Sequence, residues 1–321
     1  MSMAQKFAVG IDIGGQTSKI GVVSATGEVV SQTVMRTDTF GADAAAYMQA
    51  LADSVRKCIS DAGQTGNILG IGVGAPNGNY YTGEISNAPN LAWAAHQTVQ
   101  FRRDFSLLMD GIPVTLTNDA NAAAVGEMKY GVARGMKNFI MITLGTGVGS
   151  GIVIDGKVLY GHDGFAGELG HVNIVRRGGR LCGCGRHGCL EAYCSATGVS
   201  RTAVWKLGRS NRPSLLRGLE NISSKDVYDA ACKGDRLALD IFEYTGTLLG
   251  RAFADFIAFS APEAIVLFGG LARSGELLRA PIVKSMNASV MPIWKDKVKV
   301  LFSMLKESDA AILGASALAW K

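Results

Sequence analysis

The feature that most constrains how this chain can fold is a cluster of three cysteines within one short loop. Cys182, Cys184 and Cys189 stand in the run CGCGRHGC, which is rich in glycine. Thiolates this close together on a flexible loop can surround one tetrahedral cation, and zinc is the usual one in a reducing compartment. The alternatives are a redox dithiol or packing cysteines, but the one-residue gap after Cys182 differs from the redox C-x-x-C. The cluster therefore predicts a metal site.

Two histidines could supply the fourth ligand of this site. His187 lies inside the loop between two cysteines, where binding would tightly constrain a very short segment. His171 arrives from a separate segment, Glu168–Leu169–Gly170–His171, and would pin that segment to the loop. We favour His171. Three thiolates and one imidazole leave no coordination position open to water, so the predicted zinc is structural.

Composition narrows the class of protein. Nearly half of the 321 residues are hydrophobic, 41 are glycine and the net charge is +5. The basic residues are scattered and do not form the stripe that is typical of a nucleic-acid binder. No run approaches the ~18 apolar residues of a membrane span, and the first residues lack a signal-peptide pattern. We therefore expect a cytoplasmic protein with no nucleic-acid and no membrane partner.

The order of predicted elements indicates the α/β class, because strands alternate with helices. A strand over 7–13 runs into Gly14–Gly15 and a returning strand over 19–23. A later strand over 138–144, a turn at 145–147 and a strand over 151–154 repeat that pattern, which we interpret as an internal duplication. Further predictions are strands over 29–35, 68–73, 114–117 and 265–268, and helices over 43–62, 121–130, 237–259 and 309–320.

Asp119 follows one of the predicted buried strands, so its carboxylate can point into a cleft and act as a base. Aspartate also caps helices often, and a helix is predicted to begin just after it. The spacing alone favours neither role.

Taken together, these motifs resemble the ROK family, the repressors, open reading frames and kinases of bacterial sugar metabolism. The Glu168–His171 segment, followed by the three cysteines and Glu191, is similar to the signature of that family. Gln16 departs from it, because the family usually has threonine after the glycine pair. The further matching segments are Asp12–Gly15 and Leu144–Gly149 (phosphate motifs), Gly74–Pro76 with Pro89–Leu91 and Trp93 (sugar loop), and Leu267–Gly270 (adenosine motif).

The resemblance implies an actin-like ATPase fold, which is ribonuclease H-like and duplicated, with two lobes around an interlobe cleft. The small N-terminal lobe would comprise residues 1–120 and be completed by a C-terminal helix over 306–321. The large lobe would comprise residues 121–305 and carry the zinc loop. The resemblance also suggests a homodimer.

The implied activity is an ATP-dependent hexokinase that phosphorylates the 6-hydroxyl of a hexose, with Asp119 as the general base. Glucose is the first choice; mannose, fructose, N-acetylglucosamine and N-acetylmannosamine stay open. Asp12 would hold Mg²⁺ through water. The implied sugar ligands are Asn90, Asn118, Asp119, Glu168, His171 and Glu191, and the implied nucleotide contacts are Asp12, Gly14, Gly15, Gln16, Thr17, Gly145, Thr146, Gly147, Gly269 and Gly270.

Two other functions compete with the kinase. A repressor of this family would carry a helix-turn-helix module before the first phosphate motif, whereas Asp12 lies only twelve residues from the start. A sugar-binding protein without activity would lack part of the catalytic set, whereas Asp119 and both phosphate motifs are present. Both alternatives are therefore disfavoured.

Overall fold

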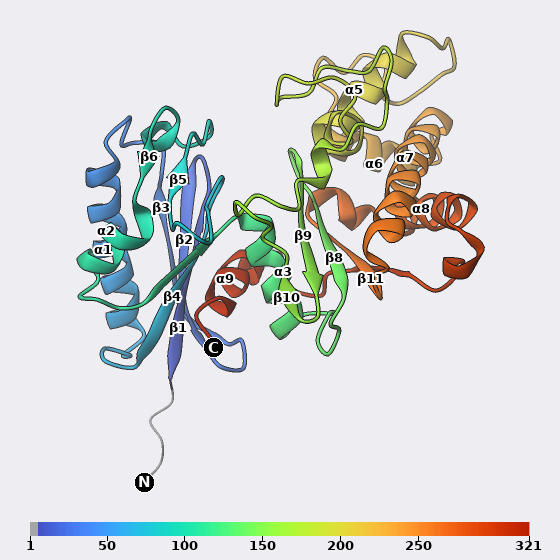
Figure 1. Cartoon of the computed structure of the whole chain (residues 1–321). Helices are drawn as coiled ribbons and strands as arrows, with labels where there is room; N and C mark the ends of the chain where they lie inside the picture. The colour runs from blue at the N-terminus through green and yellow to red at the C-terminus, as the bar shows by residue number, and fades with distance from the viewer. Residues whose placement is uncertain (1–5, 321) are drawn as a thin grey trace. The chain divides into compact units, whose positions relative to one another are not determined.

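The computed structural model describes residues 6–320 (Figure 1). The described chain divides into two compact units, and each is considered by itself. The first unit contains the residues up to Gly135, the segment Lys157–Gly167 and the residues from Met304 onward. The second unit contains Met136–Gly156 and Glu168–Ser303.

The first unit is built on a five-stranded sheet with the order β3-β2-β1-β4-β7. Strands β1, β2 and β3 form an antiparallel meander, and β4 and β7 run parallel to β1. The parallel strands therefore end at the same edge of the sheet as the β1–β2 turn. Their bounds are β1 Phe7–Ile13, β2 Thr17–Ser24, β3 Val29–Arg36, β4 Ile68–Gly74 and β7 Val114–Thr117; a small hairpin pairs β5 Ile85–Ser86 with β6 Thr98–Val99.

Helices cover both faces of this sheet, which is why β1 is buried along nearly all its length. Helix α1 (Ala44–Asp61) and helix α2 (Phe101–Leu108) lie on one face (Figure 1). There the apolar stripe of α1 packs on the alternate strand residues that point the same way. Helices α3 (Asp119–Tyr130) and α9 (Glu307–Ala317) lie on the other face (Figure 1).

Helix α9 approaches the strands so closely that only glycine fits beneath it. A Cβ atom on Gly72 of β4 would lie 1.8 Å from the carbonyl oxygen of Ala315. A Cβ atom on Gly10 of β1 would lie 2.1 Å from the carbonyl oxygen of Ile312. The backbone of the last helix thus rests directly on the backbones of β1 and β4.

A second five-stranded sheet, β10-β9-β8-β11-β12, repeats this strand order, and all its strands except β10 belong to the second unit. Strands β8 and β9 form an antiparallel hairpin, and β11 and β12 run parallel to β8. The repeat agrees with the duplication that the sequence indicates. Their bounds are β8 Phe139–Leu144, β9 Val148–Ile154, β10 Lys157–Val158, β11 Ala264–Phe268 and β12 Lys299–Phe302.

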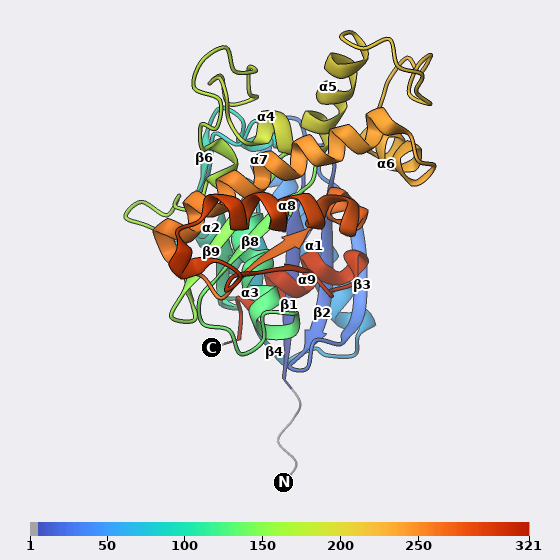
Figure 2. The ribbon, with the colours of Figure 1, turned by 90° about the vertical axis from the view of Figure 1, so that its right-hand side faces the viewer.

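The two longest helices of the second unit are α7 (Arg236–Ser260) and α8 (Glu276–Ser289), which lie side by side (Figure 2). They meet at glycines, because a Cβ atom on Gly246 would lie 2.5 Å from the ring of Pro281. The shorter helices are α4 (Glu191–Cys194), α5 (Ala196–Leu207) and α6 (Ser224–Cys232). None of the helices within residues 6–320 has the length and apolar character needed to cross a bilayer.

Some predicted boundaries differ from the structure. Helix α3 begins at Asp119, two residues before the predicted Asn121, because Asn118 caps it. Strand β9 begins at Val148, earlier than the predicted residue 151, because it pairs with β8 up to Leu144. The last helix spans Glu307–Ala317, whereas 309–320 was predicted.

We predict that Gly72→Ala destabilises the protein, because the new Cβ must push the backbone of α9 off β4. Overpacking of this kind costs about 1–3 kcal/mol. Calorimetry should show a lower melting temperature for the variant. The matched control is Gly208→Ala, where the nearest atom to the new Cβ is 3.6 Å away. Equal melting temperatures for Gly72→Ala and the wild type would contradict the prediction.

Candidate active site

The catalytic candidates of the first unit lie at the edge where β1, β4 and β7 end together. In the sheet register Asp12 is opposite Gly74, and Gly74 is opposite Thr117. Asn118 and Asp119 follow Thr117 directly, so the register brings them to the level of Asp12. Two acidic residues thus lie at one edge of the sheet.

Electrostatics reflect this convergence. The half-buried Asp12 has its pKa raised from 3.8 to about 6, first by burial and then by the negative charge of Asp119. Lys19 opposes this shift, because its positive charge lowers the pKa of Asp12. Lys19 is directly opposite Asp12 in the β1–β2 pair, and directly opposed residues share one face of a sheet. The edge therefore carries two carboxylates and one ammonium group.

Asp119 does not have to serve as the helix cap. The side-chain oxygen of Asn118 accepts the N–H of Ala120 at 2.8 Å, and Asn118 is the N-cap residue of α3. Asp119 Oδ1 also accepts this N–H at 2.8 Å, which leaves Oδ2 for another partner. Part of the residue reaches solvent, whereas burial of the carboxylate raises its pKa. A carboxylate of raised pKa at a helix start is suited to accept a proton.

The first glycine turn, Gly14–Gln16, joins β1 to β2 beside Asp12. The N–H of Gly14 donates to the carbonyl of Thr17 at 3.0 Å, and the Gln16 carbonyl accepts the N–H of Thr37 at 2.8 Å. A Cβ atom on Gly15 would lie 2.8 Å from the carbonyl oxygen of Asn90. The turn that resembles a phosphate motif therefore touches the loop that resembles a sugar site. The Gln16 side chain itself is exposed.

We predict opposite shifts of the Asp12 pKa in two variants. Asp119→Asn removes a like charge and should lower this pKa, whereas Lys19→Met removes an opposite charge and should raise it. Carbon NMR titration of the aspartate carboxyls in metal-free buffer would measure both. Asp53→Asn, on the exposed surface of α1, should leave the value unchanged. Shifts of the same sign in the first two variants would contradict this arrangement.

The second glycine turn, Gly145–Gly147, joins β8 to β9 in the second unit. The N–H of Gly145 donates to the carbonyl of Gly147 at 3.1 Å, which closes the turn. Gly269 follows the neighbouring strand β11 and has φ +100°. A Cβ atom on Gly269 would also lie 2.7 Å from the carbonyl oxygen of Leu144. Both the positive φ and this close approach therefore require glycine here. The predicted phosphate and adenosine motifs of this unit therefore lie side by side.

A pocket of about 380 Å³ opens next to Gly270. One wall is the short helix η3 (Gly270–Ser274), and the other wall is α6, which contributes Lys225 and Tyr228. The volume and the aromatic side chain suit a planar ligand group such as a nucleobase.

The segment Glu168–His171 is held against β9 of the second unit. The N–H of Leu169 donates to the hydroxyl of Ser150 at 3.1 Å. A Cβ atom on Gly170 would lie 2.1 Å from the carbonyl oxygen of Val148, so the segment lies flat on the strand. The Glu168 side chain is exposed. Glu191, at the start of α4, accepts the N–H of Val148 at 3.0 Å and the thiol of Cys182 at 3.3 Å.

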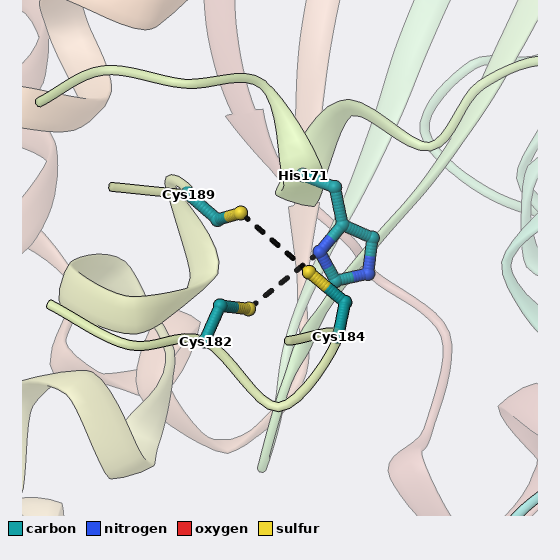
Figure 3. Close-up of side chains that lie close together, drawn as sticks. All are labelled: His171, Cys182, Cys184 and Cys189. Carbon is teal, nitrogen blue, oxygen red and sulfur yellow. Dashed lines mark hydrogen bonds between the residues drawn. The ribbon is translucent and has the colours of Figure 1, made fainter. Parts of the chain in front are cut away.

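His171 and the three cysteines of the loop form one cluster (Figure 3). Their ligand atoms all lie within 4.8 Å of one another. Nδ1 of His171 is 3.7 Å from Sγ of Cys182, and the sulfurs of Cys184 and Cys189 are also 3.7 Å apart. The alternative ligand, His187, lies outside the cluster and is 3.0 Å from the carbonyl of Gly179. The structure therefore joins His171, the favoured histidine, to the thiols.

These distances fit a zinc ion. A tetrahedron with Zn–S bonds of about 2.3 Å has edges of roughly 3.8 Å, close to the 3.7 Å separations. The four donors are the set that zinc prefers, and all four positions of the ion would be filled by protein. His171, Cys182, Cys184 and Cys189 would hold the ion, and the ion would hold the loop.

We predict one zinc ion per chain, bound more tightly as pH rises. Burial raises the pKa of the Cys182 thiol to about 12, so binding must displace a proton. Elemental analysis at several pH values after dialysis against a chelator would measure this. Cys184→Ser should lose the ion, and Cys232→Ser, an exposed cysteine outside the cluster, should keep it. Full zinc content in Cys184→Ser would contradict the assignment.

Sequence reasoning missed Lys19 at the first sheet edge and Thr197 beside the second turn. The signal for Lys19 is the hairpin register, because it lies seven positions after Asp12 and pairs with it across a tight turn. Thr197 donates its hydroxyl to the carbonyl of Thr146 at 3.1 Å. No local sequence motif predicts this contact, because the two residues are far apart in the sequence.

Comparison with known proteins identifies the fold and the family of this chain. The two repeated sheets and their glycine turns define an actin-like ATPase fold, which solved ROK kinases share. The sequence profile of the ROK family matches residues 8–321. The chain belongs to the ROK family.

Three similar proteins illustrate the range of this family. A glucokinase of Halalkalibacterium halodurans is 35% identical, over 97% of this chain and 94% of the relative. The crystal structure of a ROK glucokinase from Streptomyces griseus, in complex with glucose and AMPPNP, is 32% identical with a TM-score of 0.77, over 97% and 98% of the two chains. A xylose repressor of Caldicellulosiruptor bescii is 29% identical, over 97% of this chain and 77% of the relative.

Proposed function

We propose that this protein is an ATP-dependent kinase that phosphorylates the 6-hydroxyl of glucose. The observation that carries the proposal most directly is the pair of carboxylates, Asp12 and Asp119, at the sheet edge beside a glycine turn. Full-length similarity to glucokinases supports glucose as the sugar. A likeness to a structure that binds glucose and AMPPNP supports the two substrates.

In this proposal Asp119 accepts the proton of the 6-hydroxyl as that oxygen attacks the γ-phosphate. Phosphoryl transfer needs positioning, charge neutralisation and a base near the attacking hydroxyl. Desolvation raises the pKa of Asp119 toward the range where a carboxylate is a useful base. The amide of Asn118, with its oxygen on the helix cap, keeps its NH₂ group for a sugar hydroxyl. Asn90, Glu168 and Glu191 are the further sugar ligands that we propose.

ATP would be held by both glycine turns. The turns Gly14–Thr17 and Gly145–Gly147 would cradle the phosphates. The N–H groups of Gly14 and Gly145 close these turns, so the N–H groups of Gly15, Gln16, Thr146 and Gly147 would be the donors. Asp12 offers the hard oxygen ligand that Mg²⁺ prefers, directly or through water. The pocket beside Gly269 and Gly270 would take the adenosine.

Zinc would have a structural task in this proposal. It would fix the loop that carries Glu191 and the segment that carries Glu168, so that sugar ligands keep their positions. Nδ1 of His171 faces the cluster, and the opposite ring nitrogen, Nε2, would remain for a sugar hydroxyl (Figure 3). We also propose, from the family resemblance, a cytoplasmic homodimer.

We predict that Asp119→Asn lowers kcat by about 10²–10⁴-fold, because the amide cannot take up the proton. A coupled assay of ADP release with glucose and MgATP would measure kcat. Glucose affinity, measured by calorimetry, should change far less, because the amide keeps the shape of the side chain. For the wild type, kcat/KM should fall with decreasing pH at values above 3.8, the ordinary pKa, because protonation of the base removes activity.

The controls for this test separate the competing functions. Asp53→Asn, on the exposed face of α1, should keep wild-type kcat. A wild-type protein that binds glucose but releases no ADP would support a sugar-binding protein instead. Specific binding to operator DNA without turnover would support a repressor. Turnover of an N-acetylhexosamine with none on glucose would replace the proposed substrate.

A further inference from the structure

The second phosphate turn is held from outside by the segment Glu191–Thr197, which follows the zinc loop directly. The N–H of Ala196 donates to the carbonyl of Gly145 at 2.8 Å. The hydroxyl of Thr197 donates to the carbonyl of Thr146 at 3.1 Å. The carboxylate of Glu191 accepts the N–H of Val148 at 3.0 Å. Three successive hydrogen bonds thus join this segment to the turn and to the first residue after it.

These bonds fix which way the turn amides point. A trans peptide unit is planar, so its carbonyl and its N–H point in opposite directions. Anchoring the carbonyl of Gly145 therefore directs the N–H of Thr146 away from α5. Anchoring the carbonyl of Thr146 directs the N–H of Gly147 away in the same manner. Neither N–H donates to a backbone group within the described chain, so both are available to a ligand.

The same segment is fastened to the zinc loop at its other end. Glu191 lies two residues after the ligand Cys189, so the backbone joins it directly to the zinc loop, and its other carboxylate oxygen lies 3.3 Å from Sγ of Cys182, whose proton zinc would displace. A Cβ atom on Gly147 would lie 2.4 Å from the Glu191 carboxylate, so the contact is tight. A zinc loop that is fixed in one conformation would therefore fix Glu191, and Glu191 would in turn hold the phosphate turn.

We propose that the Glu191–Thr197 segment aligns the phosphate-binding amides of the second turn, and that Thr197 is a positioning residue for ATP. The inference rests on the proposed kinase function. It assigns the zinc loop a second task besides the support of sugar ligands, because the loop also holds the nucleotide side of the reaction.

The test is Thr197→Val, which keeps the shape of the side chain and loses the bond to Thr146. One hydrogen bond of this kind corresponds to roughly fivefold in affinity. We expect KM for MgATP to rise by about that factor while KM for glucose stays unchanged. Calorimetry with AMPPNP should show the same loss, and Thr197→Ser should restore both values. Thr26→Val loses a hydroxyl bond to Ser24 in another turn and should change neither.

Hydrogen exchange gives a readout that needs no turnover. In the wild type, AMPPNP should slow exchange of the amides at 145–148, and removal of zinc by a chelator should speed it. Thr197→Val should also speed it without ligand. Unchanged KM for MgATP and unchanged exchange in Thr197→Val would overturn the proposal.

The two proposals fail in different ways. If the wild type shows neither turnover of glucose nor protection of residues 145–148 by AMPPNP, the proposed kinase function fails. If it shows both, and the Thr197→Val enzyme matches the wild type, only the role of the segment fails. Should Thr197→Val not fold, the effect of zinc removal on exchange at 145–148 in the wild type still decides the question.

Discussion

The convergence of four ligand atoms at the cysteine loop is the constraint on which the proposed site depends. The loop between His171 and Glu191 is rich in glycine and arginine, and half of its non-glycine side chains are exposed. Such a segment buries too little apolar surface to hold one shape by packing alone. The Cys₃His cluster supplies what packing lacks, because a bound ion would fix three loop positions and one outside position together. The acidic residues on either side of the loop would then be fixed as well.

The parts of the site that sequence could predict are those whose chemistry is local. Three cysteines within one loop, a glycine pair after a buried strand, and an acid after another strand each carry their meaning in a few adjacent residues. The choice of His171 over His187 also follows from local reasoning, since a histidine between two cysteine ligands has little freedom to reach the same ion. The structure joins His171 to the thiols.

The parts that sequence could not predict depend on register and on distant contacts. The start of α3 was placed too late, because Asn118 rather than a later residue caps the helix. Lys19 faces Asp12 only because the β1–β2 turn sets a particular pairing, which a shift of one residue would reverse. The contacts of Ala196 and Thr197 with the second turn join residues that are about fifty positions apart. No periodicity or motif within either segment encodes such a meeting.

The two sheets share one strand order, and in both the glycine turn closes the antiparallel hairpin beside parallel strands. This placement explains why a duplicated fold suits a nucleotide. At the end of parallel strands, backbone N–H groups, helix starts and strand-end side chains gather at one edge. One unit adds carboxylates to its turn, whereas the other adds a pocket of about 380 Å³ and the cysteine loop. The two units therefore share one strand arrangement but carry different functional groups at its edge.

The direct packing of α9 on β1 and β4 has a consequence for how the protein folds during its synthesis. Strand β1 leaves the ribosome first, whereas the helix that covers it follows about 300 residues later. At a translation rate of about 5–20 residues per second, α9 is synthesised roughly 15–60 s after β1. During this interval one apolar face of the nascent sheet is exposed to solvent, so a chaperone that shields it until translation ends would favour correct assembly.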